Sequence, residues 1–241
     1  MGAAGIGLPL FISPRPFARI ADLAGDDTFI YELGGAAMIG YAVALALGMR
    51  GGLWRPMRFM VLAIYVFAAI AFLAGFVSFA SNHINGLVVV VLIWAVFVAW
   101  ALAQILVAHR GAVAGPRDVA TWVAIVLALA TASAAVFGLG PQLPGPFASL
   151  MGYKGTDEFV YRLAGAACFG YAVMGIQELR SLHWDDMRLP NVMALVFNGL
   201  AFLASFLEIL AGRATLLVYL VALAAGFFTI AITAIIVRRG R

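Results

Sequence analysis

Long apolar runs separated by short polar segments dominate the chain, and within each run the apolar positions are continuous rather than alternating. A bilayer core of about 30 Å requires about 20 mostly apolar residues per helix. Seven runs reach that length, at residues 28–49, 58–80, 85–108, 118–139, 158–179, 190–211 and 214–237. Strands of a membrane barrel are shorter and alternate in polarity. The pattern therefore predicts an all-α integral membrane protein with seven transmembrane helices. The alternative, that 9–17 or 147–151 also enters the membrane, stays open.

The chain also contains an internal repeat. Residues 27–43 read DTFIYELGGAAMIGYAV, and residues 157–173 read DEFVYRLAGAACFGYAV. The same offset of about 130 residues aligns the chain from residue 14 nearly to its end, with roughly a third of the aligned positions identical. Because one helix separates two sets of three, both copies have the same orientation in the membrane. We therefore predict two parallel three-helix repeats joined by a linker helix, a 3+1+3 arrangement.

The repeat divides the chain into five segments. They are an N-terminal interfacial segment at 1–27, a first repeat at 28–108, a linker helix at 109–140, a proline-rich outer loop at 141–157 and a second repeat at 158–241. Proline fixes its own backbone angle and lacks an N–H donor, so we expect the proline-rich stretch of each copy to form a stiff, non-helical lid. The apolar stretch 3–11 is short and contains Pro9, so we do not expect a cleaved signal peptide.

Basic residues are divided unevenly between the two sets of loops. One set holds ten arginines, whereas the other holds four arginines and the single lysine. Short loops rich in Lys and Arg stay in the cytoplasm, so we expect the N-terminus outside and the C-terminus inside an inner or plasma membrane. The basic rim would meet anionic lipid headgroups, and we expect no nucleic-acid partner. The predicted anchors at this interface are Arg50, Trp54 and Arg58, and in the second copy Arg180, Trp184 and Arg188.

Small residues recur on one face of the first helix of each copy. Lipid provides no hydrophobic force between helices, so close packing through small side chains holds such helices together. We therefore expect these two helices to lie at the centre of the fold. The residues that predict this packing are Gly35, Ala36 and Gly40, and Gly165, Ala166 and Gly170.

Glu32 and Arg162 occupy equivalent positions in the two copies, about one turn inside the outer boundary. An ionisable group at that depth is costly unless it is paired. We predict a Glu32–Arg162 salt bridge between the repeats. The alternative is that each side chain extends separately to the interface.

Three polar residues are candidates for lining a cleft between the repeats. Tyr41 and Tyr171 follow the small-residue faces, and Asn198 lies at mid-helix where the first copy has Ala68. A single asparagine in a membrane helix more often forms an interhelical hydrogen bond than binds a ligand. No ionisable residue is expected at mid-depth, which disfavours a charged substrate.

Features needed for catalysis or for a bound metal do not stand out. His83, His109 and His183 all fall in loops, and Cys168 is the single cysteine. Haem ligation, thiolate metal sites and internal disulfides are therefore not expected, and no nucleophile has a nearby base. We expect no enzyme and no cofactor beyond contact with lipid or pigment.

Two known families share the number and arrangement of helices. Seven helices with an outer N-terminus resemble the microbial rhodopsins, but the only lysine is Lys154, in a loop, so the retinal Schiff base has no attachment point. The 3+1+3 arrangement resembles the SWEET sugar transporters in helix count alone, and no binding residue is transferred.

Two functions fit this pattern. The first is a structural or accessory multi-pass subunit that packs against other membrane proteins, lipids or pigments in a membrane complex, as the apolar interior and short loops suggest. The second is a carrier for a neutral or lipophilic small molecule with a cleft between the repeats, as the duplication suggests. Of the two, the sequence slightly favours the subunit.

Overall fold

The computed structural model describes residues 2–52, 54–109 and 116–239, and all regular elements in these ranges are helices. Seven of the helices are long and apolar enough to cross a membrane, which confirms the prediction of a helical multi-pass membrane protein. The elements are α1 (Gly2–Ile12), α2 (Pro14–Ile20), α3 (Thr28–Gly51), α4 (Trp54–Ala80), α5 (Gly86–Ala108), α6 (Thr121–Leu139), the 3-10 helix η1 (Gly140–Gln142), α7 (Pro144–Met151), α8 (Glu158–Ser181), α9 (Trp184–Leu210) and α10 (Leu216–Arg239).

The proline-rich segments are helical, and the prediction of non-helical lids is wrong. Pro14 and Pro144 each begin a short helix, α2 and α7. The first N–H groups of a helix have no partner within it, so proline in the first turn costs little. Pro190 was expected to begin a helix, but it lies inside α9, which begins six residues earlier at Trp184. Neighbouring helices make interior prolines tolerable in membrane proteins.

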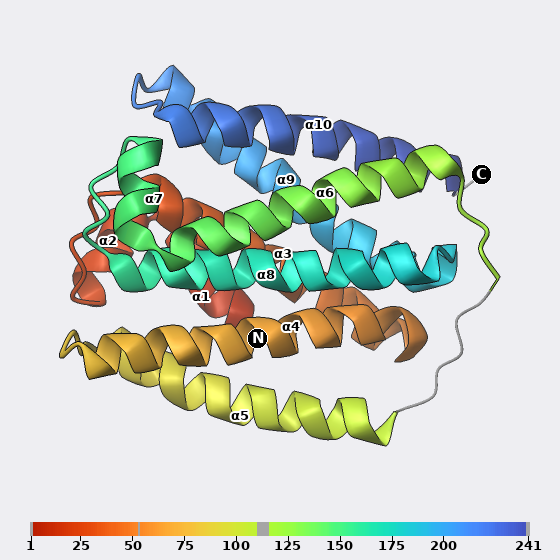
Figure 1. Cartoon of the computed structure of the whole chain (residues 1–241), viewed down its shortest axis with the longest axis horizontal. Coiled ribbons are helices and arrows are strands. Elements are labelled where there is room, and N and C mark those ends of the chain that lie inside the picture. The colour runs from red at the N-terminus through yellow and green to blue at the C-terminus, as the bar shows by residue number, and fades with distance from the viewer. Residues whose placement is uncertain (1, 53, 110–115, 240–241) are drawn as a thin grey trace.

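The connections between the long helices gather at two opposite ends of the bundle (Figure 1). We call the end with residues 21–27, 81–85, 143–157 and 211–215 the acidic end. The opposite end, with residues 116–120 and 182–183, is the basic end. Helices α2 and α7 both lie at the acidic end (Figure 1). Of the ten arginines assigned to the basic end, Arg110, Arg241 and the side chain of Arg239 lie outside the described residues.

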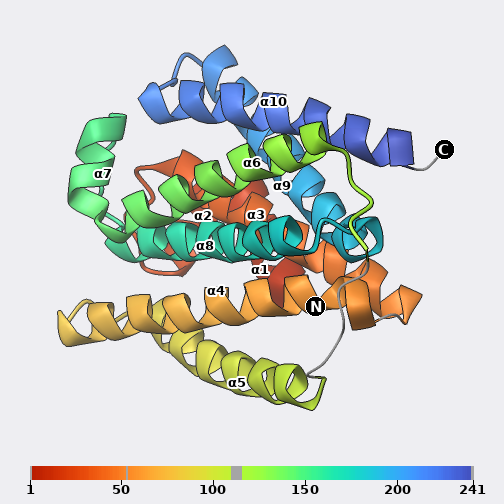
Figure 2. The same cartoon turned by 45° about the vertical axis from the view of Figure 1, so that its right-hand side comes forward.

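The two parts of the chain are interlocked rather than stacked side by side. We call residues 1–108 the first half and residues 109–241 the second half. Helix α3 packs more extensively on α9 than on its neighbour α4, and α8 packs more extensively on α4 than on α9. Helix α8 lies between α6 and α4 in both views, with α5 beyond α4 (Figures 1 and 2). Each half therefore depends on a helix of the other half for its packing.

Helix α1 packs beside α3 in the way that α6 packs beside α8. A Cβ atom added to Gly35 would lie 2.6 Å from the backbone nitrogen of Phe11, so the two backbones are in close contact. Gly35 is about two helical turns into α3. Within the segment 1–27, which was predicted to lie at the interface, α1 thus lies along a membrane-spanning helix. The other helix of this segment, α2, lies at the end of the bundle.

Candidate functional site

Two aspartates at the acidic end join the halves. The Asp157 carboxylate accepts hydrogen bonds from the backbone N–H groups of Ala24 and Gly25, both at 2.8 Å, and from the Tyr31 hydroxyl at 2.6 Å. All three donors belong to the first half. The carboxylate is buried, with 5% of the residue surface exposed.

Asp27 makes the reciprocal contacts with the second half. It accepts hydrogen bonds from the backbone N–H groups of Lys154 at 3.2 Å and Gly155 at 2.8 Å, and from the Tyr161 hydroxyl at 2.8 Å. Gly25 and Gly155 both have positive φ, +68° and +72°, which points their N–H groups at the opposite aspartate and favours glycine. We call this reciprocal arrangement the double aspartate lock.

The predicted Glu32–Arg162 salt bridge is wrong. Arg162 instead pairs with Glu158, one turn earlier in the same helix, at 2.7 Å. Glu32 lies within the electrostatic influence of Glu208 and Arg213, which form their own ion pair at 2.8 Å. Equivalent depth on two helices does not make their side chains face each other, because α3 and α8 each pack mainly on another helix. The double aspartate lock joins the halves at this end instead.

Two tyrosines meet at the centre of the bundle. Their ring centroids are 5.0 Å apart. The Tyr41 hydroxyl donates to the carbonyl oxygen of Ala167 at 3.0 Å, and the Tyr171 hydroxyl donates to that of Ala37 at 3.2 Å. Each tyrosine thus crosses into the other half.

The small residues make room for these contacts. A Cβ atom on Gly40 would collide with the Tyr171 hydroxyl, and one on Gly170 would collide with the Tyr41 hydroxyl. Gly165 lies against η1 and the end of α6, as Gly35 lies against α1. Ala36 and Ala166 are fully buried. The predicted packing face therefore contacts several helices rather than a single partner.

An apolar cavity of about 110 Å³ lies between α6, α8, α9 and α10, with α3 closing one side. It is partly open to the surroundings. Its lining extends from Ala164 to Glu178 on α8, which corresponds to a length of about 21 Å at 1.5 Å per helical residue. The cavity is therefore long and narrow, and it is formed mainly by the second half.

A buried polar pair lies at the basic end of this cavity. Glu178 and Asn191 both line it and are 3% and 1% exposed. The Asn191 amide nitrogen donates to Glu178 Oε1 at 2.8 Å and to the Met187 carbonyl oxygen at 2.9 Å. The Asn191 Oδ1 atom is buried and has no hydrogen-bond partner among the described residues. The site therefore presents an unused acceptor next to a buried carboxyl group.

A second cavity, also of about 110 Å³, lies at largely equivalent positions in the first half, between α1, α3, α4, α5 and α8. Met38 and Trp94 line it where Cys168 and Ala224 line the first cavity. It has no buried carboxyl–amide pair, because Gly48 and Val61 stand where the second half has Glu178 and Asn191.

The three predicted cleft residues are divided between two places. Tyr171 and Asn198 line the first cavity, whereas Tyr41 is in the lining of neither cavity. The Asn198 amide nitrogen donates to the Ala194 carbonyl oxygen of its own helix at 2.8 Å. The predicted interhelical hydrogen bond of Asn198 is thus wrong, and its oxygen remains available at the cavity wall.

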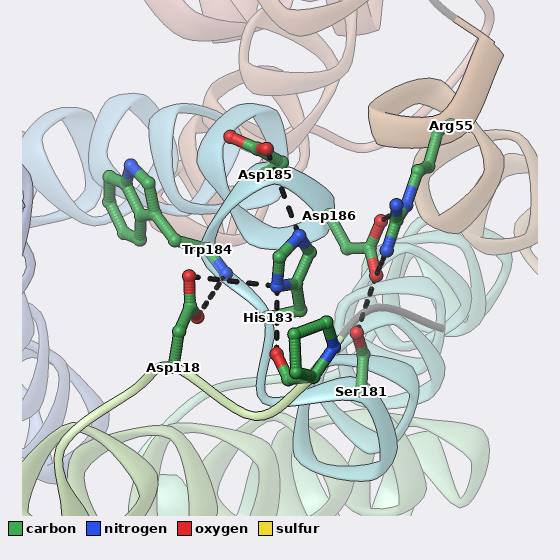
Figure 3. Close-up of polar contacts among 8 residues, drawn as sticks. Arg55, Asp118, Ser181, His183, Trp184, Asp185 and Asp186 are labelled. Atoms are coloured by element: carbon green, nitrogen blue, oxygen red, sulfur yellow. Dashed lines mark hydrogen bonds and ion pairs between the residues drawn. The ribbon is translucent and has the colours of Figure 1, made fainter. Parts of the chain in front are cut away.

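The basic end is held by contacts around the start of α9. Asp186 lies between Arg55 of α4 and Ser181 of α8 and binds both side chains (Figure 3). His183 lies between Asp118, at 3.5 Å, and Asp185, at 3.7 Å (Figure 3). The Arg55–Asp186 pair joins the halves at the opposite end from the double aspartate lock.

The predicted interface anchors differ in exposure. Arg50, Arg180 and Arg188 are exposed, whereas Arg58, Trp54 and Trp184 are half-buried. The Trp54 ring packs on His109 with 4.4 Å between centroids, and its indole N–H is buried. The three exposed arginines are placed as headgroup anchors would be, whereas Arg58 and the two indoles are partly covered by protein.

Sequence reasoning missed Glu178 and Asn191. Glu178 lies near the end of its apolar run, where an acid is expected to reach the interface, but its carboxyl group is buried in the protein. The available signal was the internal comparison: both are polar where the first half has Gly48 and Val61.

Known proteins do not add to this site. Comparison with family models, curated proteins and solved structures gave no match. Within the described residues, no group of three His, Cys, Asp or Glu side chains is placed to hold a metal ion. The cavity and its polar pair are therefore the candidate functional site.

Proposed function

We propose that the protein is a carrier that binds a small lipophilic molecule in the cavity between α6, α8, α9 and α10. The observation that carries this proposal is a partly open apolar cavity with a buried polar pair at one end. Ligand sites are typically apolar pockets with a few polar groups that fix orientation. Dry packing alone would not require an unpaired buried amide oxygen.

The cavity volume limits the size of the ligand. An engineered apolar cavity of about 150 Å³ in another protein binds benzene, and the present cavity of about 110 Å³ is somewhat smaller. Because this volume is spread along α8, it suits a single narrow chain better than a fused ring system. Sterols and whole phospholipids are too large to be enclosed.

We further propose that the halves are like-oriented repeats, with the acidic end outside and the basic end in the cytoplasm. The reciprocal contacts of Asp27 and Asp157, and of Tyr41 and Tyr171, support the repeat. The exposed arginines at the basic end support the orientation. In this arrangement the polar pair lies toward the cytoplasmic side of the cavity.

An accessory subunit is the second candidate. Helix α5 packs mainly on α4 and is the least buried of the seven spans. Its free surface carries Phe97 and Trp100, which are 66% and 65% exposed. A helix of a partner protein would fit this face as well as lipid does, so this role does not compete with ligand binding.

Cys168 provides a direct test because it is the single cysteine and lines the cavity. The purified protein in lipid nanodiscs is treated with methyl methanethiosulfonate, and labelling is followed by intact mass. Octan-1-ol is expected to slow labelling at least threefold. Ala224→Trp, which adds a bulky side chain to the wall of this cavity, is expected to weaken the protection by octan-1-ol.

The matched control is Leu223→Trp, at a neighbouring position that is 75% exposed. It adds the same side chain outside the cavity and should leave the protection by octan-1-ol intact. The proposal is overturned if neither octan-1-ol nor octylamine protects Cys168. It is also overturned if protection is equal in the two tryptophan variants.

A further inference from the structure

We infer that the Glu178–Asn191 pair is a binding site for the ammonium group of a lipophilic primary amine. This inference rests on the proposed function, since it assigns the polar end of the ligand in the same cavity. It is carried by the buried carboxyl group, the unpartnered amide oxygen and the cavity that both residues line.

The orientation of the Asn191 side chain is fixed by its neighbours. Its amide nitrogen donates to two oxygens, Glu178 Oε1 and the Met187 carbonyl. Turning the amide over would set Oδ1 against both of these acceptors, which is unfavourable. The Oδ1 atom must therefore remain where it has no donor. A buried acceptor without a hydrogen bond costs about 1–3 kcal/mol.

An ionised Glu178 would also lack a cationic partner among the described residues. None of the ion pairs among the described residues involves this carboxyl group. An ionisable residue inside a membrane-spanning helix is costly, and such residues usually mark a substrate or ion path. A cation that enters the cavity would supply the missing partner.

The two residues together select a ligand with several donors. The site offers the Asn191 oxygen and the Glu178 carboxylate as acceptors, whereas the Asn191 amide nitrogen already donates to two oxygens. A primary ammonium group has three N–H donors and a positive charge, so it satisfies both residues. An alcohol has one donor and no charge, and a carboxylate would repel Glu178.

The first half provides an internal comparison. Its cavity has a similar volume, but Gly48 and Val61 replace the polar pair. It should therefore accept the apolar body of a ligand without preference for an amine.

The experiment compares octylamine, octan-1-ol and octanoate as protectants of Cys168 in nanodiscs of a zwitterionic lipid. These probes share one apolar body. Octylamine is expected to protect at a concentration at least tenfold lower than octan-1-ol, and octanoate should protect least. In Glu178→Gln and in Asn191→Leu, octylamine should protect Cys168 only at the concentration that octan-1-ol requires.

A second reporter separates site recognition from enrichment of amine in the lipid. In the Met38→Cys/Cys168→Ser variant the thiol lies in the other cavity, and octylamine and octan-1-ol should protect it equally. If octylamine and octan-1-ol protect Cys168 equally, or if the advantage of octylamine survives in Glu178→Gln, the inference is wrong while the proposed function stands. If no probe protects Cys168, the proposed function fails as well.

Discussion

The double aspartate lock makes the sharpest prediction for stability. Replacing Asp157 by asparagine removes one acceptor oxygen. The amide NH₂ group that takes its place faces N–H and O–H donors and finds no acceptor among them. The carboxylate now accepts three hydrogen bonds, two from backbone N–H groups and one from Tyr31. Hydrogen bonds to a charged group contribute about 1.5–3 kcal/mol each, and an unsatisfied buried donor costs about 1–3 kcal/mol. Losing one such bond should lower the free energy of unfolding by about 2–4 kcal/mol.

The measurement is reversible unfolding in mixed micelles with increasing sodium dodecyl sulfate, followed by circular dichroism. Asp27→Asn should give a change of similar size, because its contacts are the reciprocal ones. The control is Asp26→Asn, whose carboxylate pairs with Lys154 on the surface at 3.2 Å. Exposed pairs contribute about 0–1 kcal/mol, so this variant should change little.

A double-mutant cycle tests the crossing of the two halves directly. Tyr31→Phe should couple to Asp157→Asn by about 1 kcal/mol or more, because the two side chains share a hydrogen bond. Tyr161→Phe should couple less to Asp157→Asn, since Tyr161 donates to Asp27. Equal coupling for the two tyrosines would refute the crossed arrangement, and so would an Asp157→Asn variant as stable as Asp26→Asn.

Two further predictions concern packing and the basic end. Gly34 has open space around it and stands where the second half has Ala164, so Gly34→Ala should be neutral or stabilising by up to about 1 kcal/mol. Gly40→Ala should instead destabilise by about 1–3 kcal/mol, because its Cβ would collide with the Tyr171 hydroxyl. Arg55→Ala leaves the buried Asp186 without its cation and should cost about 1–2 kcal/mol, reduced because the Arg55 side chain is 39% exposed. Arg50→Ala is the exposed control in the same region, and the same unfolding titration measures all four variants. Equal stability of Gly34→Ala and Gly40→Ala, or of Arg55→Ala and Arg50→Ala, would contradict the assigned contacts.

The apolar pattern was sufficient to predict the seven spans, because bilayer thickness imposes a minimum length that few other constraints override. It was less reliable at prolines. Pro190 lies inside α9 because tertiary neighbours compensate for a missing donor, and such neighbours are not visible in a single run of residues.

Contacts between the halves were harder to predict. The repeated motif contains both parts of the lock, Asp27 with Tyr31 and Asp157 with Tyr161, yet nothing in either copy shows that each tyrosine binds the aspartate of the other. That pairing follows from the exchange of packing partners, α3 with α9 and α8 with α4. The Glu32–Arg162 prediction failed for the same reason, since it assumed that helices of equal depth also face each other.

The comparison of the two halves separates structural positions from those proposed to bind a ligand. The residues of the double aspartate lock are the same in both halves: aspartates 27 and 157, glycines 25 and 155, and tyrosines 31 and 161. The two reciprocal contacts stabilise the same interface between the halves. A substitution in either contact therefore weakens that interface, so both halves require the same residues. Glu178 and Asn191 are under no such requirement, because Gly48 and Val61 fill their places in the first half. Glu178 is a buried acid that the packing does not require, and the neighbouring Asn191 oxygen has no hydrogen-bond donor. Both features destabilise the fold, and a cationic ligand would offset that cost.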